Sequence, residues 1–420
     1  MISPVHTWIA ETTRLGESLN EFTLREWQSE KLIKKIQYAR DHSRFYRNLP
    51  DFSGHLEELP FTTPGDITKD PMAFLAIPPA EVSRITTLNT SGTTGAKKRI
   101  FFSESDIARI RNYFAVGMKS LVSEGQNVQI LISDETVNSL GYLLRSALED
   151  VGVSSCILSV IPDCQAAIAA SRNADCIVGM PAEIFYMCRT EPGLRPKSIL
   201  LTADYVPDSI IKAIEKTWHC EVFTHYGMTE TGFGYAVDCS CHCGHHTRDA
   251  EILVEIIDPV TGQSCDAGKK GEIVISMLAN EAMPLIRYRT GDLSCFTLSP
   301  CKCGSSLKLL GKIESRYEDA ISLPEGQSIN IRHLDELLFS IESIRGFEAA
   351  LIFKEGIPHL YLVVDSLKKL CAESILSVLP SSFQITIHFT TCDPFIHRGK
   401  KRLYRDFSHP AFAGFCDDCD

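Results

Sequence analysis

A short stretch rich in glycine and hydroxyl side chains is the first candidate for chemistry. Residues 90–98 read TSGTTGAKK, so two glycines, two lysines and several hydroxyls lie within nine positions. Glycine lets the backbone turn its N–H groups toward an anion, hydroxyls donate hydrogen bonds and lysine supplies charge. This composition predicts a phosphate-binding loop, and a threonine-rich surface turn is the alternative. The candidate phosphate-binding residues are Thr90, Ser91, Gly92, Thr93, Thr94, Gly95 and Lys98.

Cysteine and histidine gather in two segments further along the chain. Residues 239–246 read CSCHCGHH, and residues 301–304 read CKCG. A Cys-x-Cys-Gly knuckle paired with a distant Cys/His cluster predicts a structural Zn²⁺ site. A catalytic zinc is not expected, because four protein ligands leave no open position. Free thiols on a loop are the alternative.

The elements that must position these side chains can be read from hydrophobic patterns. Residues 82–89 and 99–102 read as strands on either side of the glycine-rich loop. Between residues 104 and 223, short apolar runs alternate with helical patterns, which is typical of a parallel sheet covered by helices. The runs lie at 128–132, 153–161, 176–179 and 198–201, and the helical patterns at 104–123, 139–148, 164–171 and 182–188.

The pattern changes after residue 223. Three strands broken by turns, at 252–257, 272–276 and 285–288, indicate a small antiparallel subdomain. From about residue 311 a further βαββαβ-like order indicates a compact α+β unit. The predicted fold class is therefore α/β, with an N-terminal domain at 1–310, its β subdomain at about 237–310 carrying the zinc ligands, and a small α+β domain at 311–420.

Size and charge narrow the function classes. The chain has 420 residues and a formal net charge of −11, which argues against a general nucleic-acid or membrane-surface role. The sequence shows no targeting segment and no apolar run long enough to span a bilayer, so a cytoplasmic protein is expected. Sixteen cysteines in such a chain indicate reduced thiols or metal ligands. The oligomeric state is open, with a homodimer as one alternative.

Three more motifs follow the glycine-rich loop in a definite order. They are HYGMTET at 225–231, YRTGD at 288–292 and HRGKKR at 397–402. Together with residues 90–98, this set resembles the adenylate-forming superfamily of acyl-CoA synthetases, and most closely its phenylacetate–CoA ligase branch. The similarity covers nearly the whole chain, beginning at the helical segment 39–47 and the LPFTT segment at 59–63.

The resemblance implies a two-step reaction and a fold. ATP and a carboxylate give an acyl-adenylate and pyrophosphate, and a thiol, usually coenzyme A, then displaces AMP. Residues 90–98 would lie over the β- and γ-phosphates, Glu230 would hold Mg²⁺, and the Thr229 hydroxyl would contact the α-phosphate. Lys400 matches the catalytic lysine, although the neighbouring Lys401 could hold that place. The small C-terminal domain is expected to be mobile, since this lysine serves only the first step.

The resemblance also implies the remaining nucleotide contacts and the metal ligands. Tyr226 would pack on adenine, with Gly227 and Met228 in the same motif, and Asp292 would accept both ribose hydroxyls. Ala203 and Asp204 match a segment beside adenine, and Lys312 matches the hinge. Aligning on Gly244 selects Cys239, His246, Cys301 and Cys303 as zinc ligands, with Cys241, Cys243 and His245 as substitutes or spares.

Two segments depart from the family pattern. Residues 320–326 lack the Arg-Gly pair usual near the pantetheine channel, which weakens the case for coenzyme A. Residues 132–142 are polar and poor in aromatic side chains, which argues against phenylacetate and leaves an aryl or small organic acid. A carboxylate–CoA ligase is the favoured reading. An adenylyltransferase that makes no thioester and a non-catalytic nucleotide-binding protein are the alternatives.

Overall fold

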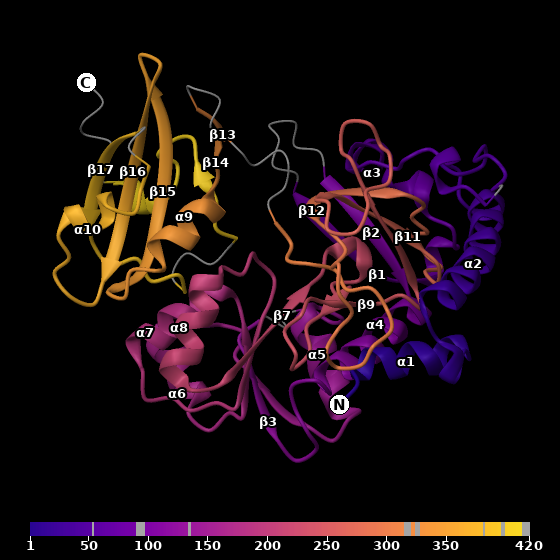
Figure 1. The fold of residues 1–420 in the computed structure, drawn as a ribbon, viewed down its shortest axis with the longest axis horizontal. Coiled ribbons are helices and arrows are strands. Elements are labelled where there is room, and N and C mark those ends of the chain that lie inside the picture. Colours follow the sequence, from indigo (N-terminus) through magenta and orange to yellow (C-terminus); the bar gives the residue numbers. More distant parts are fainter. Residues whose placement is uncertain are drawn as a thin grey trace. The chain divides into compact units, whose positions relative to one another are not determined.

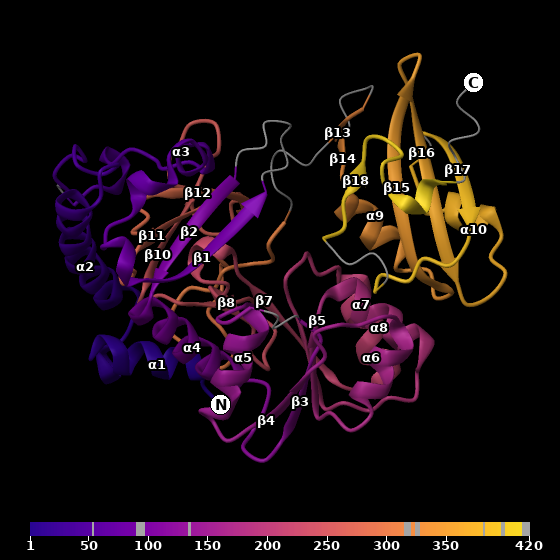
Figure 2. The ribbon, with the colours of Figure 1, turned by 180° about the vertical axis from the view of Figure 1, so that it is seen from behind.

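The chain folds into two compact units that interleave along the sequence. The structure is a computed structural model that describes residues 1–52, 54–89, 97–132, 136–314, 321–323, 328–380, 383–395 and 400–413, without the side chains of residues 89 and 97. The loop residues Thr90, Ser91, Gly92, Thr93, Thr94 and Gly95 lie outside this description. Unit 1 comprises Met1–Gly125, Asp134–Val153 and Phe223–Tyr317, and unit 2 comprises Gln126–Ser133, Ser154–Val222 and Glu318–Asp420 (Figures 1 and 2).

Side-chain caps start the main helices of unit 1. Asn20 and Thr63 each begin a helix with a reciprocal capping box, and so does Ser103. These caps fix where the chain turns from loop into helix. The helices are α1 (Pro4–Thr13), α2 (Glu21–His42), α3 (Pro64–Lys69), α4 (Glu104–Met118) and α5 (Leu140–Glu149), and the 3₁₀ turns are η1 (Gly16–Ser18), η2 (Leu56–Glu58), η3 (Pro71–Phe74), η4 (Pro79–Glu81) and η5 (Thr229–Thr231).

Two antiparallel sheets of unit 1 carry site residues. The hairpin of β1 (Val82–Asn89) and β2 (Lys97–Ser103) pairs Leu88 with Lys98, so Lys98 occupies a fixed register. A three-stranded sheet follows in the order β10 (Ile252–Ile257), β11 (Gly271–Met277) and β12 (Tyr288–Ser294). The strand predicted at 285–288 is misplaced, because pairing with β11 runs through Tyr288–Ser294. Arg287 turns the chain beforehand with φ 46° and donates to buried Glu255.

A third group of strands in unit 1 holds two of the predicted motifs. β7 (Glu221–Tyr226) enters this unit at Phe223 and pairs antiparallel with β8 (Ala236–Val237), which pairs in turn with β9 (His246–Thr247). The turn η5 lies between β7 and β8. The HYGMTET motif is therefore the end of a strand followed by a tight turn.

Unit 2 contains the predicted parallel sheet. Its strands run in the order β4 (Ser154–Ile157), β3 (Asn127–Ile130), β5 (Cys176–Gly179) and β6 (Ser198–Leu201), all parallel. β5, β6 and the helix α6 (Cys164–Ser171) have the predicted bounds. The other helices here are α7 (Pro181–Thr190) and α8 (Asp208–Trp218), and α8 was not among the predicted helices.

The C-terminal part of unit 2 is the predicted α+β fold. A four-stranded sheet has the order β17-β16-β15-β18, with β15 and β16 as a long antiparallel hairpin (Figure 2). Buried side chains of α7 and α9 join one hydrophobic core, in which the rings of Phe185 and Phe339 lie 4.7 Å apart. The elements are β13 (Ile321–Ser322), β14 (Ser328–Ile329), α9 (Ile331–Leu338), β15 (Ile344–Lys354), β16 (Ile357–Ser366), α10 (Ala372–Leu376), β17 (Gln384–Phe389) and β18 (Leu403–Tyr404).

Two general expectations can be compared with the described part of the chain. Across these residues, every helix is too short or too polar to cross a membrane. Each cysteine in the same residues is a free thiol. The domain boundary predicted at residue 311 stays a prediction.

Candidate active site and metal centre

A buried carboxylate in unit 1 is the centre of the candidate active site. Glu230, in η5, is 3% exposed and forms an ion pair with Lys98 from β2. The hydroxyl of Tyr288 donates a 2.7 Å hydrogen bond to the same oxygen, Oε1. Burial acts to raise the pKa of Glu230, but the Lys98 charge and the hydrogen bonds outweigh it and the pKa is lowered. Glu230 is therefore ionised at neutral pH.

The turn that carries Glu230 is fixed by its glycines. A Cβ on Gly227 would lie 1.9 Å from the carbonyl oxygen of Phe233. Gly232 has φ +72°, and a Cβ there would meet Ile110 at 2.4 Å. Only glycine fits both positions, so the backbone on either side of η5 is closely packed. Thr229 and Glu230 are held between these two points.

A tyrosine–aspartate pair lies in the same unit. The hydroxyl of Tyr226, at the end of β7, donates a 2.8 Å hydrogen bond to Oδ2 of Asp292 on β12. Burial and the Asp292 charge raise the pKa of Tyr226 well above its ordinary value, so the hydroxyl keeps its proton. The Tyr226 ring contacts the edge of Tyr235 at 5.8 Å. Both ends of the Tyr226 side chain are thus positioned.

Backbone irregularity aims the Asp292 carboxylate. The pairing of β11 with β12 shifts register between Glu272 and Val274. Gly291 has φ +78°, a conformation that favours glycine, and its N–H donates to Glu272 Oε1 at 3.0 Å. A bulge of this kind redirects the side chain that follows it. The glycine of the YRTGD motif therefore serves the orientation of Asp292.

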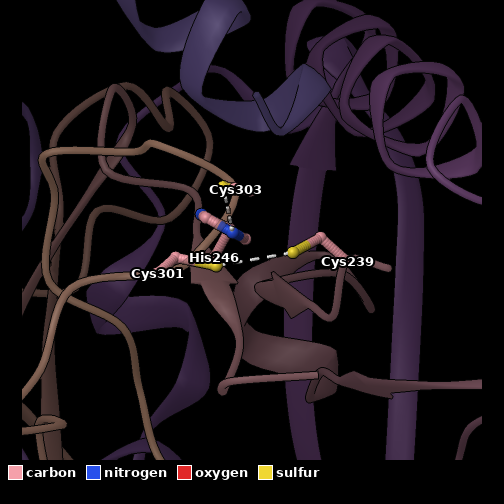
Figure 3. Close-up of side chains that lie close together, drawn as sticks. All are labelled: Cys239, His246, Cys301 and Cys303. Atoms are coloured by element: carbon pink, nitrogen blue, oxygen red, sulfur yellow. Dashed lines mark hydrogen bonds between the residues drawn. The ribbon is translucent and has the colours of Figure 1, made fainter. Parts of the chain in front are cut away.

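Four side chains of unit 1 lie close enough together to hold one metal ion. Cys239 follows β8, His246 lies in β9, and Cys301 and Cys303 lie on one turn after β12 (Figure 3). Their ligand atoms all lie within 4.8 Å of one another. Cys239 Sγ is 3.6 Å from Cys301 Sγ, and Cys303 Sγ is 3.6 Å from His246 Nε2. Ligands of a tetrahedral zinc ion lie roughly 3.4–3.8 Å apart, so these spacings fit zinc.

Burial changes the ionisation of two members of this cluster. Burial raises the pKa of Cys239 to about 11 and lowers the pKa of His246 to about 4. His246 is therefore a neutral ligand, and the thiols need a positive charge beside them to lose their protons. Two of the other candidate ligands have hydrogen-bond partners outside this set of four. Cys243 Sγ donates to the Cys241 carbonyl, and Thr224 Oγ1 lies 2.9 Å from His245 Nε2.

Two glycines shape the loops that carry the metal ligands. Gly244 has φ +134°, and a Cβ there would lie 2.9 Å from the Leu310 carbonyl oxygen. Gly304 has φ +93° and its N–H donates to the Cys301 carbonyl, which closes the Cys-x-Cys-Gly knuckle. The same four cysteine and histidine ligands that the family resemblance selects are the ones brought together.

The remaining predicted residues of the site lie in unit 2 or are exposed. Ala203 has φ 70°, and the carboxylate of Asp204 accepts the backbone N–H of Tyr205 at 2.8 Å. Lys400 is exposed. In unit 1, Lys312 is exposed, and its carbonyl accepts the hydroxyl of Ser294.

Sequence reasoning did not assign a role to Tyr288, although it opens the YRTGD motif. The sequence did point to Tyr288, because Asp292 in the same motif is a predicted nucleotide-binding residue. Tyr288 is 1% exposed, and its ring also lies 5.9 Å from the Lys98 ammonium. It belongs with Glu230 and Lys98.

A family model and several curated proteins match this chain. The family model "AMP-binding enzyme" matches residues 25–279. Phenylacetate-coenzyme A ligase of Thermus thermophilus is 26% identical over 368 residues, which covers 81% of this chain and 80% of that protein. The enzyme of the same name from Escherichia coli is 23% identical over 398 residues, covering 88% and 85%.

Solved structures share the fold. 2-Hydroxyisobutyryl-CoA ligase, in the postadenylation state with R3-HIB-AMP, superposes with a TM-score of 0.79 at 16% identity, covering 96% of this chain and 94% of that one. A benzoate CoA ligase from Burkholderia xenovorans gives a TM-score of 0.51 at 13% identity, covering 70% and 63%. The predicted adenylate-forming fold is confirmed. Because the family model spans more than half of the sequence, the chain belongs to the AMP-binding enzyme family.

Proposed function

We propose that the chain is an AMP-forming acid–CoA ligase. It joins a carboxylic acid to ATP as an acyl-adenylate and then passes the acyl group to coenzyme A. The observation that carries this proposal is Glu230, a buried carboxylate kept ionised by Lys98 and Tyr288 at the end of the HYGMTE motif. Relatives named as phenylacetate-coenzyme A ligases support the same chemistry.

In the first step, a carboxylate oxygen attacks the α-phosphorus of ATP. The bond from that phosphorus to the bridging oxygen breaks, and pyrophosphate leaves with the electron pair. Negative charge grows on the phosphate oxygens, so donors and cations fixed beforehand lower the barrier. Thr229 would donate to the α-phosphate, and Lys400 would hold the incoming carboxylate against it.

We propose that Lys98 pairs with two anionic groups in turn, first Glu230 and then the phosphates of ATP. Without nucleotide, its ammonium neutralises Glu230. We infer that ATP draws Lys98 onto its phosphates, together with residues 90–95. Glu230 is then an ionised, buried oxygen ligand, which suits Mg²⁺. When bound there, Mg²⁺ would neutralise charge on the phosphate oxygens.

Asp292 and Tyr226 would hold the nucleoside. An ionised carboxylate has acceptor capacity beyond the bond from Tyr226, so Asp292 can accept ribose hydroxyls. The hydrogen bond also keeps the Tyr226 ring in place, with its face available to adenine. Gly227 and Met228 belong to the same motif as Tyr226, and the family resemblance adds Ala203 and Asp204 as proposed adenine contacts.

In the second step, the thiol of coenzyme A attacks the acyl carbon. The sulfur–carbon bond forms, the thiol loses its proton, and AMP leaves with the oxygen it received from the acid. Residues 311–420 are proposed to move about Lys312 between the two steps. The acid is proposed to be an aryl or small organic acid other than phenylacetate, against which the polar, aromatic-poor residues 132–142 argue.

We also propose that Cys239, His246, Cys301 and Cys303 hold a structural Zn²⁺. Four buried protein ligands leave no coordination position for a substrate. The ion would instead link the strand β9 to the turn after β12. A cytoplasmic location, where thiols stay reduced, goes with this proposal.

The test is a library of carboxylic acids in two assays. Acid-dependent exchange of pyrophosphate into ATP reports the first step, and AMP release that depends on coenzyme A reports the second. The ligase predicts both activities with the same acid. Exchange without thiol-dependent AMP release would point to an adenylyltransferase. ATP binding without exchange for any acid would point to a non-catalytic nucleotide-binding protein.

A further inference from the structure

Two adjacent lysines near the C-terminus have opposite surroundings in unit 2. Lys400 is exposed, whereas the side chain of Lys401 is only 11% exposed. Lys401 Nζ lies 2.9 Å from Oδ1 of Asp335 on α9, and Asp335 is 4% exposed. The same ammonium lies 4.6 Å from the ring centre of Phe339 and 3.1 Å from that of Phe347. Lys401 is thus committed to contacts inside the fold.

A second contact holds the backbone of the same residue. The N–H of Lys401 donates a 2.9 Å hydrogen bond to Oδ2 of Asp204, in the loop after β6. The other oxygen of Asp204 accepts the N–H of Tyr205 at 2.8 Å. Each carboxylate oxygen of Asp204 therefore accepts a backbone hydrogen bond. Residue 401 is held through its main chain by one segment and through its side chain by another.

Burying these charged side chains costs free energy. Burial raises the pKa of Asp335 to about 6 and raises the pKa of Asp204, although Lys401 favours the ionised form of both carboxyls. Glu348, on β15, is a third, partly buried carboxyl whose pKa burial raises and Lys401 lowers. Apolar side chains of similar size would often stabilise a fold at least as well as such buried charges. What the charges add is one defined position for residue 401.

We propose that Asp204 and Asp335 are positioning residues that clamp Lys401 and thereby aim Lys400 at the reacting carboxylate. The proposal rests on the proposed function for the role of Lys400. Asp335 and Lys401 both belong to residues 318–420, so their ion pair orders that segment itself. Asp204 belongs to the loop where the nucleotide is proposed to bind, so its bond ties the lysine segment to that loop. The Asp204 bond would serve the adenylation step only.

The activity test compares the two half-reactions in three variants. Lys401→Met keeps the length of the side chain and removes its charge, Lys401→Arg keeps the charge, and Glu342→Gln removes an exposed ion pair with Lys216 as a control. Lys401→Met should slow acid-dependent pyrophosphate exchange at least about tenfold through kcat, with a KM for ATP within about twofold. Thioester formation from supplied acyl-adenylate should change less than about twofold. Lys401→Arg should recover most of the exchange rate, and Glu342→Gln should match the wild type.

Two results would overturn the clamp. One is a Lys401→Met protein that exchanges at the wild-type rate. The other is an equal loss in both half-reactions with a lowered melting temperature, which a structural role alone would produce.

A second measurement is independent of catalysis. Amide hydrogen exchange should be slow at Lys401 in the wild type and at least about tenfold faster in Asp204→Ala, with Glu342→Gln unchanged. Unchanged protection in Asp204→Ala contradicts the clamp. If the wild type showed no acid-dependent activity, the proposed function would fail while this measurement still decided whether Asp204 holds Lys401.

Discussion

The hydroxyl of Tyr288 donates to Glu230 across 2.7 Å, and the oxygen that accepts it is the one paired with Lys98. Two different strands thus supply the partners of one buried carboxylate. Removal of Tyr288 Oη leaves Glu230 short of a donor, which costs about 1–3 kcal/mol for a buried charged acceptor. We expect Tyr288→Phe to lower the rate of acid-dependent exchange roughly tenfold, measured as kcat at saturating ATP. An unchanged kcat would mean that this bond is not used in the reaction.

The Lys98–Glu230 pair should also control how stability depends on pH. The pKa of Glu230 in the folded protein is below its ordinary 4.5. Its contribution to stability is therefore present above pH 4.5 and is lost as the pH falls through the lowered folded-state value. In Lys98→Met, burial acts without the lysine charge, and the pKa of Glu230 should rise.

The measurement is urea unfolding of the wild type and Lys98→Met at neutral pH and near pH 4. At neutral pH the variant should be destabilised by about 3–5 kcal/mol, because it buries an unpaired charge. The difference should shrink near pH 4, where Glu230 in the variant takes up a proton. A difference that does not depend on pH contradicts the lowered pKa.

The glycine before the turn η5 offers a matched pair of substitutions. Gly227→Ala would place a Cβ 1.9 Å from the Phe233 carbonyl oxygen, so the turn carrying Glu230 must move. Gly65→Ala, in α3, would meet only Thr63 Oγ1 at 3.6 Å. We expect Gly227→Ala to lose at least about a hundredfold in kcat/KM, since small displacements of a site are costly. Gly65→Ala should be active and within about 1 kcal/mol of the wild-type stability.

Substitutions of Asp292 and Tyr226 should raise the KM for ATP by different amounts. Asp292→Ala removes the proposed acceptor of the ribose hydroxyls and should raise the KM for ATP by about 10–100-fold. Tyr226→Phe keeps the ring for adenine and removes only the bond to Asp292, so the KM should rise less than about tenfold. Steady-state kinetics at varied ATP decides, and equal KM values for both variants would contradict the assignment.

The metal centre is tested by metal content. The double variant Cys301→Ser/Cys303→Ser should purify without zinc and unfold with at least about 3 kcal/mol less stability. Cys241→Ser, which removes a thiol outside the ligand set, should keep a full complement of zinc. Elemental analysis with thermal unfolding provides both values. Zinc retained by the double variant would exclude these ligands.

Much of this fold could be predicted from the sequence, because its signals are local. The runs at 176–179 and 198–201 are short, apolar and bounded by turns, and both are strands with the predicted ends. Thr63 and Ser103 are followed three residues later by Asp66 and Asp106, and both pairs form caps. The metal ligands were selected because their residue types are rare and the family spacing is specific.

What the sequence could not predict depends on contacts between distant segments. The strand predicted at 285–288 was misplaced, since no local pattern marks the turn at Arg287, whose side chain forms an ion pair with the distant Glu255. The ion pair that sets Lys401 apart from Lys400 is made with Asp335, which no local pattern marks. α8 is a different case, because Ile210, Ala213, Ile214 and Trp218 recur at helical spacing and the signal was present in the sequence.

In the proposed reaction, the carboxylic acid itself attacks the α-phosphorus of ATP, and Glu230 lies in the site that holds the nucleotide. The direct measurement uses an accepted acid labelled with a heavy oxygen isotope in its carboxylate, and mass spectrometry of the AMP formed in the presence of coenzyme A. We expect a single labelled oxygen in AMP and none in pyrophosphate, with the labelled product absent in Glu230→Gln. AMP without label, or label in pyrophosphate or inorganic phosphate, would contradict it.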